Sequence, residues 1–304
     1  EDKSCSLHLH SISNRQFGPF YSTSNSLGLL LATGNVGKYL SNKEDEVNTY
    51  LSRDGGLNWY EIIQGSHIYE IGDHGSIIIV ANDQTAVQHI YYTWNEGHSW
   101  TILKVSDTPI EIRNIITEPS NTAQKFILYG RTSSASNDTK GVVKARKGVI
   151  IGIDFSTMHE RDCVYPDKPD DEKSDYETWT PHAYLDGSCL MGHQLTYVRR
   201  KRMAECFNPQ EFEKVFSFKN CTCTEEDWEC DIGYERSKNG PCQLPEGEQP
   251  SYEPPEECDG YYTISSGYRK VAGNTCQGGV DHQPMKFPCQ SRIFSKQSMT
   301  LLLG

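Results

Sequence analysis

Among the residue types that can do chemistry, cysteine is the most informative in this chain because of its number and spacing. Ten of the eleven cysteines fall between residues 163 and 289, among prolines, glycines and charged residues. Such a segment has little apolar surface with which to offset its ordering entropy. We therefore predict five disulfides in place of a large core. The ten residues are Cys163, Cys189, Cys206, Cys221, Cys223, Cys230, Cys242, Cys258, Cys276 and Cys289.

Two other uses of clustered cysteines fit the spacing less well. A zinc site needs ligand pairs at short regular gaps, whereas the tightest pair, Cys221 and Cys223, is separated by one residue and has no histidine beside it. Cys–His catalysis is disfavoured because each clustered cysteine has a role in a bridge. The acidic residues 225–231 could bind calcium, but they lack the EF-hand pattern, and a solvated acidic face fits them better. We predict no metal and no cofactor.

The net charge and the glycosylation sequons help to identify the cellular compartment of the protein. The net charge of -12 argues against nucleic-acid binding through a basic patch. Asn137 and Asn220 each begin an Asn-x-Thr glycosylation sequon, although Asn220 adjoins a cysteine whose bridge could form first. No run of eighteen apolar residues is present. Together with the cysteines, the sequons favour the lumen of the secretory and endosomal pathway (Golgi, endosome).

The first 155 residues are expected to form a different kind of structure from the cysteine-rich segment. Apolar residues alternate or run for short distances between turn formers, without helical periodicity, which predicts an all-β fold. The expected strands span residues 27–33, 47–51, 68–71, 76–81, 87–93, 100–105, 110–116, 125–130 and 148–155.

A repeated turn motif organises these strands. Both copies follow the pattern Ser/Thr-x-Asp/Asn-x-Gly-x-x-Trp, the Asp-box, and their tryptophans are 41 residues apart, the length of one four-stranded propeller blade. The Asp or Asn side chain can accept backbone N–H groups in a hairpin corner, and glycine supplies the dihedral that a side chain resists. The two copies are Ser52, Asp54, Gly56 and Trp59, and Thr93, Asn95, Gly97 and Trp100.

The blade count is too small for a closed ring. Residues 27–63, 67–105 and 110–155 account for three blades, whereas closed propellers typically need four to eight. The missing blades are expected to precede residue 1, and these 304 residues are expected not to fold alone. Cys5, the single cysteine outside the cluster, is unpaired within the chain, so we expect its partner upstream of residue 1.

Asp-boxes followed by a ten-cysteine segment resemble the luminal domain of the sortilin family, the vacuolar-protein-sorting-ten receptors. The resemblance covers the chain up to about Cys289, is closest to the fungal vacuolar carboxypeptidase sorting receptors, and leaves out residues 291–304. It rests on five local stretches: Cys-Ser-Leu-His-Leu-His at 5–10, Asp-Gly-Gly at 54–56, Asp-Gly-Ser-Cys at 186–189, Cys-Asp-Ile-Gly-Tyr at 230–234, and Gly-Tyr-Arg-Lys at 267–270 leading to Cys-Gln-Gly-Gly-Val at 276–280.

The resemblance implies an organisation that the residues alone do not give. Members have a ten-bladed propeller with a tunnel, two small cysteine-rich modules, a membrane span and a cytoplasmic tail. Residues 1–157 would be the last three blades, 158–220 the first module, 221–290 the second module, and 291–304 a tail. The chain would contact a membrane only through a span outside it. Its partners would be the earlier blades, in the same or a separate chain, and soluble vacuolar or lysosomal hydrolase or peptide cargo carried from the Golgi to the endosome or vacuole.

The same resemblance implies a disulfide pairing, which the residues alone leave open among many connectivities. The implied pairs are Cys163–Cys206, Cys189–Cys221, Cys223–Cys276, Cys230–Cys242 and Cys258–Cys289. It gives no ligand-binding residue in this chain, because the best-known peptide anchors of the animal relatives lie in earlier blades.

Two other function classes remain open at this stage. An extracellular adhesive or structural module fits the composition. A sialidase-like glycoside hydrolase would also carry Asp-boxes, but it needs an arginine cluster, and the five arginines of the β part do not suggest one: Arg15, Arg53, Arg113, Arg131 and Arg146. We therefore predict a non-enzyme. The basic stretch 197–202 is interpreted as an exposed strand or helix end, with a protease-sensitive loop or a contact for the acidic face as alternatives.

Overall fold

The structure is a computed structural model that describes residues 5–12, 16–18, 20–132, 146–164, 169–181, 189–210, 214–236, 240–249 and 252–289. It is nearly all β, which confirms the predicted fold class. No helix of the described residues is long and apolar enough to cross a membrane. Asn137, its sequon and the tail 291–304 lie outside the described residues.

The chain divides into two compact units. One comprises Glu1–Asp186 with Thr196–Ser217, and the other comprises Gly187–Leu195 with Phe218–Gly304. The division passes through strands β13 (His193–Arg200) and β14 (Lys214–Asn220), which form a three-stranded sheet with β12 (Tyr176–Trp179). The four segments expected from the resemblance, with boundaries after residues 157, 220 and 290, stay a prediction.

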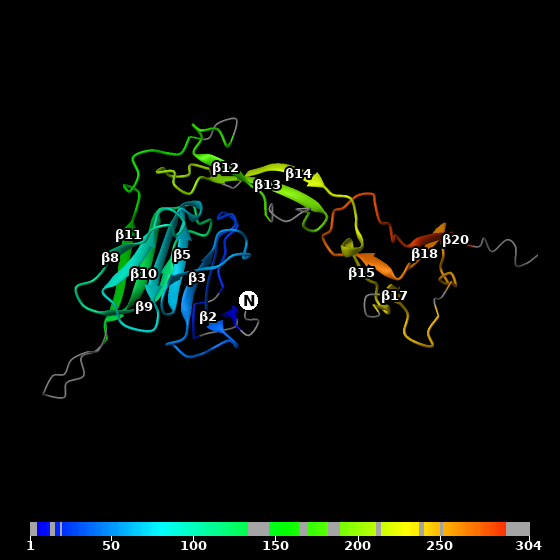
Figure 1. The fold of residues 1–304 in the computed structure, drawn as a ribbon, viewed down its shortest axis with the longest axis horizontal. Coiled ribbons are helices and arrows are strands. Elements are labelled where there is room, and N and C mark those ends of the chain that lie inside the picture. Colours follow the sequence, from blue (N-terminus) through cyan, green and yellow to red (C-terminus); the bar gives the residue numbers. More distant parts are fainter. Residues whose placement is uncertain are drawn as a thin grey trace, which may run out of the picture. The chain divides into compact units, whose positions relative to one another are not determined.

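The first unit contains three antiparallel sheets in which successive strands are neighbours, as in propeller blades (Figure 1). The first sheet consists of β1 (Ser6–Leu9), β2 (Leu30–Gly37), β3 (Asn48–Ser52) and β4 (Tyr60–Ile63). The second consists of β5 (His67–Gly72), β6 (Ile77–Asn82), β7 (His89–Thr93) and β8 (Thr101–Lys104), with a 3-10 turn η1 (Asp73–Gly75) between its first two strands. The third consists of β9 (Ile110–Ile116), β10 (Lys125–Thr132) and β11 (Gly148–Asp154).

Strand β6 shows why its sequence is a continuous apolar run. Side chains alternate between the two faces of a strand. Ile77 and Ile79 belong to an apolar cluster with Leu128 of the third sheet, whereas Ile78 belongs to a second cluster with Leu31 of the first sheet. All five residues are fully buried. The middle sheet is therefore covered on both faces, and its strands need apolar residues at every position.

The first sheet has two strands, β1 and β4, that are not among the expected ranges. Strand β1 pairs with β2 in antiparallel register, from Ser6 opposite Gly37 to Leu9 opposite Gly34. It is only four residues long and none of its residues is fully buried, so it carries no strong apolar signal. The first sheet thus begins before the expected residue 27, and Cys5, immediately ahead of β1, is free and exposed.

Among the described residues, the third sheet has three strands, one fewer than the other two sheets, and one of its faces carries exposed apolar side chains. Four large apolar side chains are exposed on it, Ile116 by 40%, Ile127 by 46%, Tyr129 by 40% and Ile150 by 79%. Residues Ile116 and Ile127 are register partners, as are Tyr129 and Ile150, so the four residues share one face. A face of this kind is normally an interaction surface.

The second unit is made of short strands held by disulfides. Its strands are β15 (Trp228–Cys230), β16 (Glu235–Arg236), β17 (Cys242–Gln243), β18 (Tyr261–Ile264), β19 (Tyr268–Lys270) and β20 (Met285–Pro288), paired two by two, with a 3-10 turn η2 (Glu225–Asp227). Three of its few buried residues are the half-cystines Cys223, Cys242 and Cys276. The bridges therefore replace an apolar core, as the composition predicts.

Five disulfides are present. Their pairing is the one implied by the resemblance: Cys163–Cys206, Cys189–Cys221, Cys223–Cys276, Cys230–Cys242 and Cys258–Cys289. The first of them packs in a small buried cluster with Tyr176 and Val198. Asn220 is half-buried at the end of β14, directly before Cys221. Glycosylation of Asn220 stays a prediction.

Candidate functional site: the Asp-box corners and two surface cavities

The first Asp-box closes the hairpin between β3 and β4 with hydrogen bonds from its own short side chains. The Ser52 hydroxyl donates to Asp54 Oδ1 at 2.8 Å and accepts the N–H of Gly56 at 2.9 Å. Asp54 Oδ1 also accepts the N–H groups of Leu57 at 3.1 Å and Asn58 at 2.9 Å. Partial burial disfavours the Asp54 carboxylate, but these hydrogen bonds outweigh it and lower the pKa of Asp54 below its ordinary value.

The second Asp-box has the same geometry at the hairpin between β7 and β8. The Thr93 hydroxyl donates to Asn95 Oδ1 at 2.9 Å and accepts the N–H of Gly97 at 3.1 Å. Asn95 Oδ1 accepts the N–H of Ser99 at 2.9 Å. Trp100 packs against the apolar cluster between the first two sheets. In the first corner, Trp59 Nε1 donates to Gly56 O at 2.8 Å.

Two glycines allow a matched test of how closely the second corner packs. Gly97 and Gly55 have almost the same φ, 76° and 77°. A Cβ atom on Gly97 would lie 2.5 Å from Leu51 Cδ2, whereas one on Gly55 would meet no heavy atom within 4 Å. We expect Gly55→Ala to lower the free energy of unfolding by about 1 kcal/mol, the cost of the left-handed conformation. Gly97→Ala should cost about 1–3 kcal/mol more through overpacking, as measured by urea denaturation. Equal losses would contradict the close packing.

Arginines of the basic stretch 197–202 bind the carbonyls of the second corner. Arg200 Nη2 donates to Trp94 O at 3.1 Å, and Arg200 Nη1 donates to Ala204 O. Arg202 Nε donates to Asn95 O at 3.1 Å, and Arg202 Nη2 donates to Glu96 O at 3.1 Å. Because Arg200 is only 4% exposed, its interpretation as part of an exposed strand or helix end is wrong.

A third arginine extends these contacts to the first corner. Arg199 Nη1 donates to Arg53 O at 3.2 Å, and Arg199 Nε donates to Glu177 Oε1 at 2.9 Å. Its guanidinium lies 5.0 Å from the ring centroid of Trp179, a cation–π contact. The two corners are themselves joined, since Arg53 Nε donates to Glu96 Oε2 at 2.7 Å.

This arrangement encloses a cavity of about 490 Å³ in the first unit. Leu51, Ile62 and Trp100 contribute apolar surface, and Tyr60 is 62% exposed. Arg202 contributes a guanidinium group that two backbone carbonyls hold in place. The Asp-box motif predicts the corners, but no local signal in residues 197–202 predicts that arginines more than a hundred residues away complete them.

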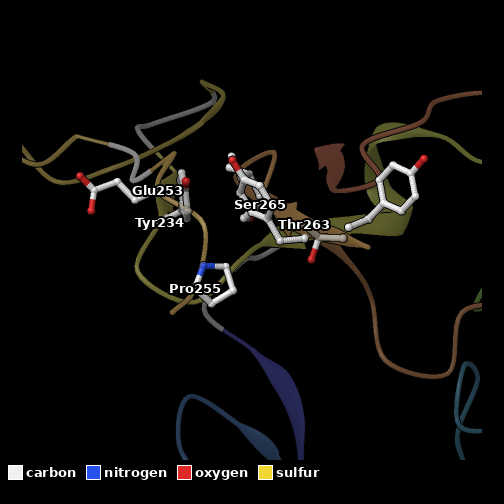
Figure 2. A pocket seen from close by; sticks show the side chains of 8 residues that line it. Tyr234, Glu253, Pro255, Thr263 and Ser265 are labelled. Carbon is white, nitrogen blue, oxygen red and sulfur yellow. The ribbon is translucent and has the colours of Figure 1, made fainter. Parts of the chain in front are cut away.

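The second unit has a cavity of its own, of about 660 Å³, and three of its eight lining residues are tyrosines. Figure 2 shows Tyr234, Pro255 and Thr263 around it. Tyr261 is 72% exposed, and the Tyr262 hydroxyl donates to Tyr252 O at 2.9 Å. Glu253 is the one charged residue in the lining that the structure describes, so this lining has no positive charge with which to attract an anion.

The acidic stretch 225–231 has a structural role in this unit. Asp227 Oδ2 accepts the Thr224 N–H at 2.7 Å, and Asp227 Oδ1 accepts Asn274 Nδ2 at 2.6 Å. Asp231 Oδ2 accepts the hydroxyl of Ser265 at 2.5 Å. Among the described residues, the only group whose potential metal ligands converge is Cys163, Asp175 and Cys206, and its cysteines form a disulfide.

Three arginines do converge in the first unit, contrary to the expectation from the sequence. Arg113, Arg131 and Arg146 each have a guanidinium nitrogen within 3.5 Å of Glu111 Oε2, at 3.0, 2.7 and 3.5 Å. In a glycoside hydrolase of the sialidase type, such a cluster would hold a substrate carboxylate. Here Glu111 of the chain itself occupies that position. Arg15 lies outside the described residues.

Comparisons with known proteins cover nearly the whole chain. Residues 1–115 match the family model described as "Sortilin, neurotensin receptor 3", and residues 117–289 match the model for its C-terminal part. The chain is 38% identical over 300 residues to a Vacuolar protein sorting/targeting protein 10 of Coccidioides posadasii, covering 95% of this chain and 19% of that protein. Proteins of the same name from Uncinocarpus reesii and Penicillium rubens are 37% and 35% identical, again over 95% of this chain, and 20% and 19% of those proteins are covered.

The chain spans about a fifth of the length of these relatives. Their names describe sorting proteins, which agrees with the prediction of a non-enzyme. The Asp-box corners and the cysteine-rich segment lie in the parts matched by the two models, in the order that the resemblance requires. On these matches the chain belongs to the sortilin family.

Proposed function

We propose that this chain is the C-terminal part of the luminal, ligand-binding region of a type I transmembrane sorting receptor. The receptor binds soluble hydrolase or peptide cargo in the Golgi and carries it to the endosome or vacuole. The observation that carries the proposal is the continuous match to the sortilin models, with relatives named for vacuolar sorting. The five disulfides support a luminal location, since they persist in oxidising compartments.

The proposed first partner is the remainder of the propeller. In the part of the chain that the structure describes, the third sheet has three strands where the others have four, and β11 is at its edge. Its exposed face combines apolar side chains such as Ile127 and Ile150 with the arginines that surround Glu111. A soluble protein seldom leaves such a face uncovered. These features support packing against earlier blades of the same receptor, which would complete a ten-bladed ring.

The proposal predicts cargo binding that weakens in acid. We expect the complete luminal region to bind a purified soluble vacuolar carboxypeptidase precursor at pH 7, and its affinity to fall by about tenfold at pH 5, since histidines gain charge over this range. Calorimetry at both pH values tests this. Unchanged affinity would exclude a histidine switch, whereas no binding at pH 7, together with normal cargo sorting in cells that lack the receptor, would contradict the proposed function.

Two buried histidines predict a separate effect of acid, on the stability of the first unit rather than on cargo affinity. His10 is 1% exposed and His67 is 3% exposed. Burial lowers the pKa of both below the ordinary value, so the unfolded chain takes up protons first as the pH falls. Their contribution to stability is complete above about pH 6.5 and is lost as the pH falls below it. The blades are therefore expected to loosen in an acidic compartment.

A further inference from the structure

The cavity beside the Asp-box corners has the features of a ligand site, and one part of its lining is apolar. Leu51 and Ile62 of the first sheet line it, together with Trp100, which directly precedes β8. Tyr60 stands beside them on β4, opposite Leu51 in register, with 62% of its surface exposed. A cavity of about 490 Å³ is large enough for one or two amino-acid side chains.

The arginines that line the cavity differ in their partners. Arg53 pairs with Glu96, and Arg199 pairs with Glu177. Among the residues that the structure describes, Arg202 makes no ion pair, and its two described hydrogen bonds go to backbone carbonyls. Its guanidinium is always charged and has five N–H donors, so donors remain for a further acceptor.

Two carboxylates also line the cavity; their described hydrogen bonds come from neutral N–H and hydroxyl groups and leave their charges in place. Asp54 accepts the hydrogen bonds of its own Asp-box turn. Glu61 accepts Asn48 Nδ2 at 2.9 Å. Burial, followed by the charge of Arg53, lowers the pKa of Arg202 below its ordinary value. The charge of Glu96 opposes this shift, but Glu96 already pairs with Arg53, so a further carboxylate would be a favourable partner for Arg202.

We propose that this cavity binds a carboxylate carried next to an apolar or aromatic side chain, with Arg202 as its partner and Tyr60 and Trp100 as the apolar contacts. Arg202 donates to the carboxylate through its remaining N–H groups, and the neighbouring side chain enters the apolar part. Such a carboxylate is either an internal Asp or Glu of a peptide or the C-terminus of a peptide. This inference rests on the proposed function. It adds a ligand class for the cavity beside the Asp-box corners, to which the proposed function assigns no ligand.

Four synthetic peptides separate the two sources from non-specific binding. The probes are acetyl-Gly-Phe-Glu-Phe amide, its Gln counterpart, acetyl-Gly-Gly-Phe with a free C-terminus, and its C-terminal amide, each titrated into the complete luminal region. We expect at least one acid to bind about tenfold or more tightly than its neutral counterpart, because a charge-assisted hydrogen bond is lost. Equal affinity within both pairs overturns the proposal, as does a preference for methyl mannoside over all four peptides.

Variants of two residues locate the binding. Arg202→Met should weaken binding of the acid by about 10–100-fold and leave that of the neutral peptide unchanged. Since Arg202 also holds the corner, Tyr60→Glu is the second variant: Tyr60 is exposed, and a carboxylate there should repel the ligand by about tenfold or more, whereas Tyr60→Phe should bind as the wild type. Tyr39→Glu, at a residue that is 72% exposed and does not line the cavity, is the control. Equal affinity of Tyr60→Glu and Tyr39→Glu overturns the site while leaving hydrolase binding, and so the proposed function, untouched.

Discussion

Replacing Arg200 with alanine is expected to lower the free energy of unfolding by about 3–5 kcal/mol. Its guanidinium is buried and donates to Trp94 O and Ala204 O, so the variant leaves carbonyls without donors. Burial raises the pKa of the fully buried Asp73, and the charge of Arg200 opposes that shift by favouring the Asp73 carboxylate. Removing one charge from such a group leaves the other buried and uncompensated. Urea denaturation of the complete luminal region, followed by tryptophan fluorescence, measures the loss.

The matched control for this variant is Arg113→Ala. The Arg113 side chain is 52% exposed, and its partner Glu111 retains contacts with Arg131 and Arg146. An exposed ion pair of this kind contributes little, so the expected change is below about 0.5 kcal/mol. If the two variants lost the same stability, Arg200 would be no more than a surface charge, and the corner would owe its stability to the Asp-box residues alone.

The strands were largely predictable because their signal is local. The apolar run of β6 follows from the cover on both of its faces and can be seen in the printed sequence. Strand β3 was found from alternating residues, although the structure buries Thr49, Tyr50, Leu51 and Ser52 in succession. The Asp-box likewise contains its own hydrogen-bond donors and acceptors within eight residues, so its turn could be derived without the fold. Strand β1 could not, because it is short and only partly buried.

The contacts of the basic stretch were not predictable for the opposite reason. Arg200 and Trp94 are separated by 106 residues, and nothing near either residue marks the other as its partner. Four basic residues in succession are typical of an exposed surface, and only the packing of the strand against the corner shows that Arg200 is buried. The convergence of Arg113, Arg131 and Arg146 on Glu111 is a similar case, since it depends on the register of β9 against β10 and on the position of the residues before β11.

The pairing of the cysteines is another feature that the residues alone could not predict. The number of cysteines predicts five bridges, but their pairing came from the resemblance, because an unaligned sequence leaves many connectivities open. In the structure the bridges differ in the length of chain that they close: Cys223 and Cys276 are 53 residues apart, and Cys230 and Cys242 are 12 apart. Both lie in the second unit, which makes them a matched pair for measuring what a bridge contributes where an apolar core is small.

We expect the Cys223→Ala/Cys276→Ala double variant to unfold the second unit at 37 °C. The chain-entropy model gives about 4 kcal/mol for a loop of this length and about 3 kcal/mol for the Cys230–Cys242 loop. The longer bridge is also the more buried, at 5% and 2% exposure for its two cysteines, so its removal leaves a cavity as well. The Cys230→Ala/Cys242→Ala variant should therefore keep more structure. Limited proteolysis and hydrogen exchange of both variants in the complete luminal region measure this, with protection of strands β5–β8 as the internal control. Earlier unfolding of the Cys230–Cys242 variant would show that local strain or packing, and not loop closure, determines which bridge holds the unit together.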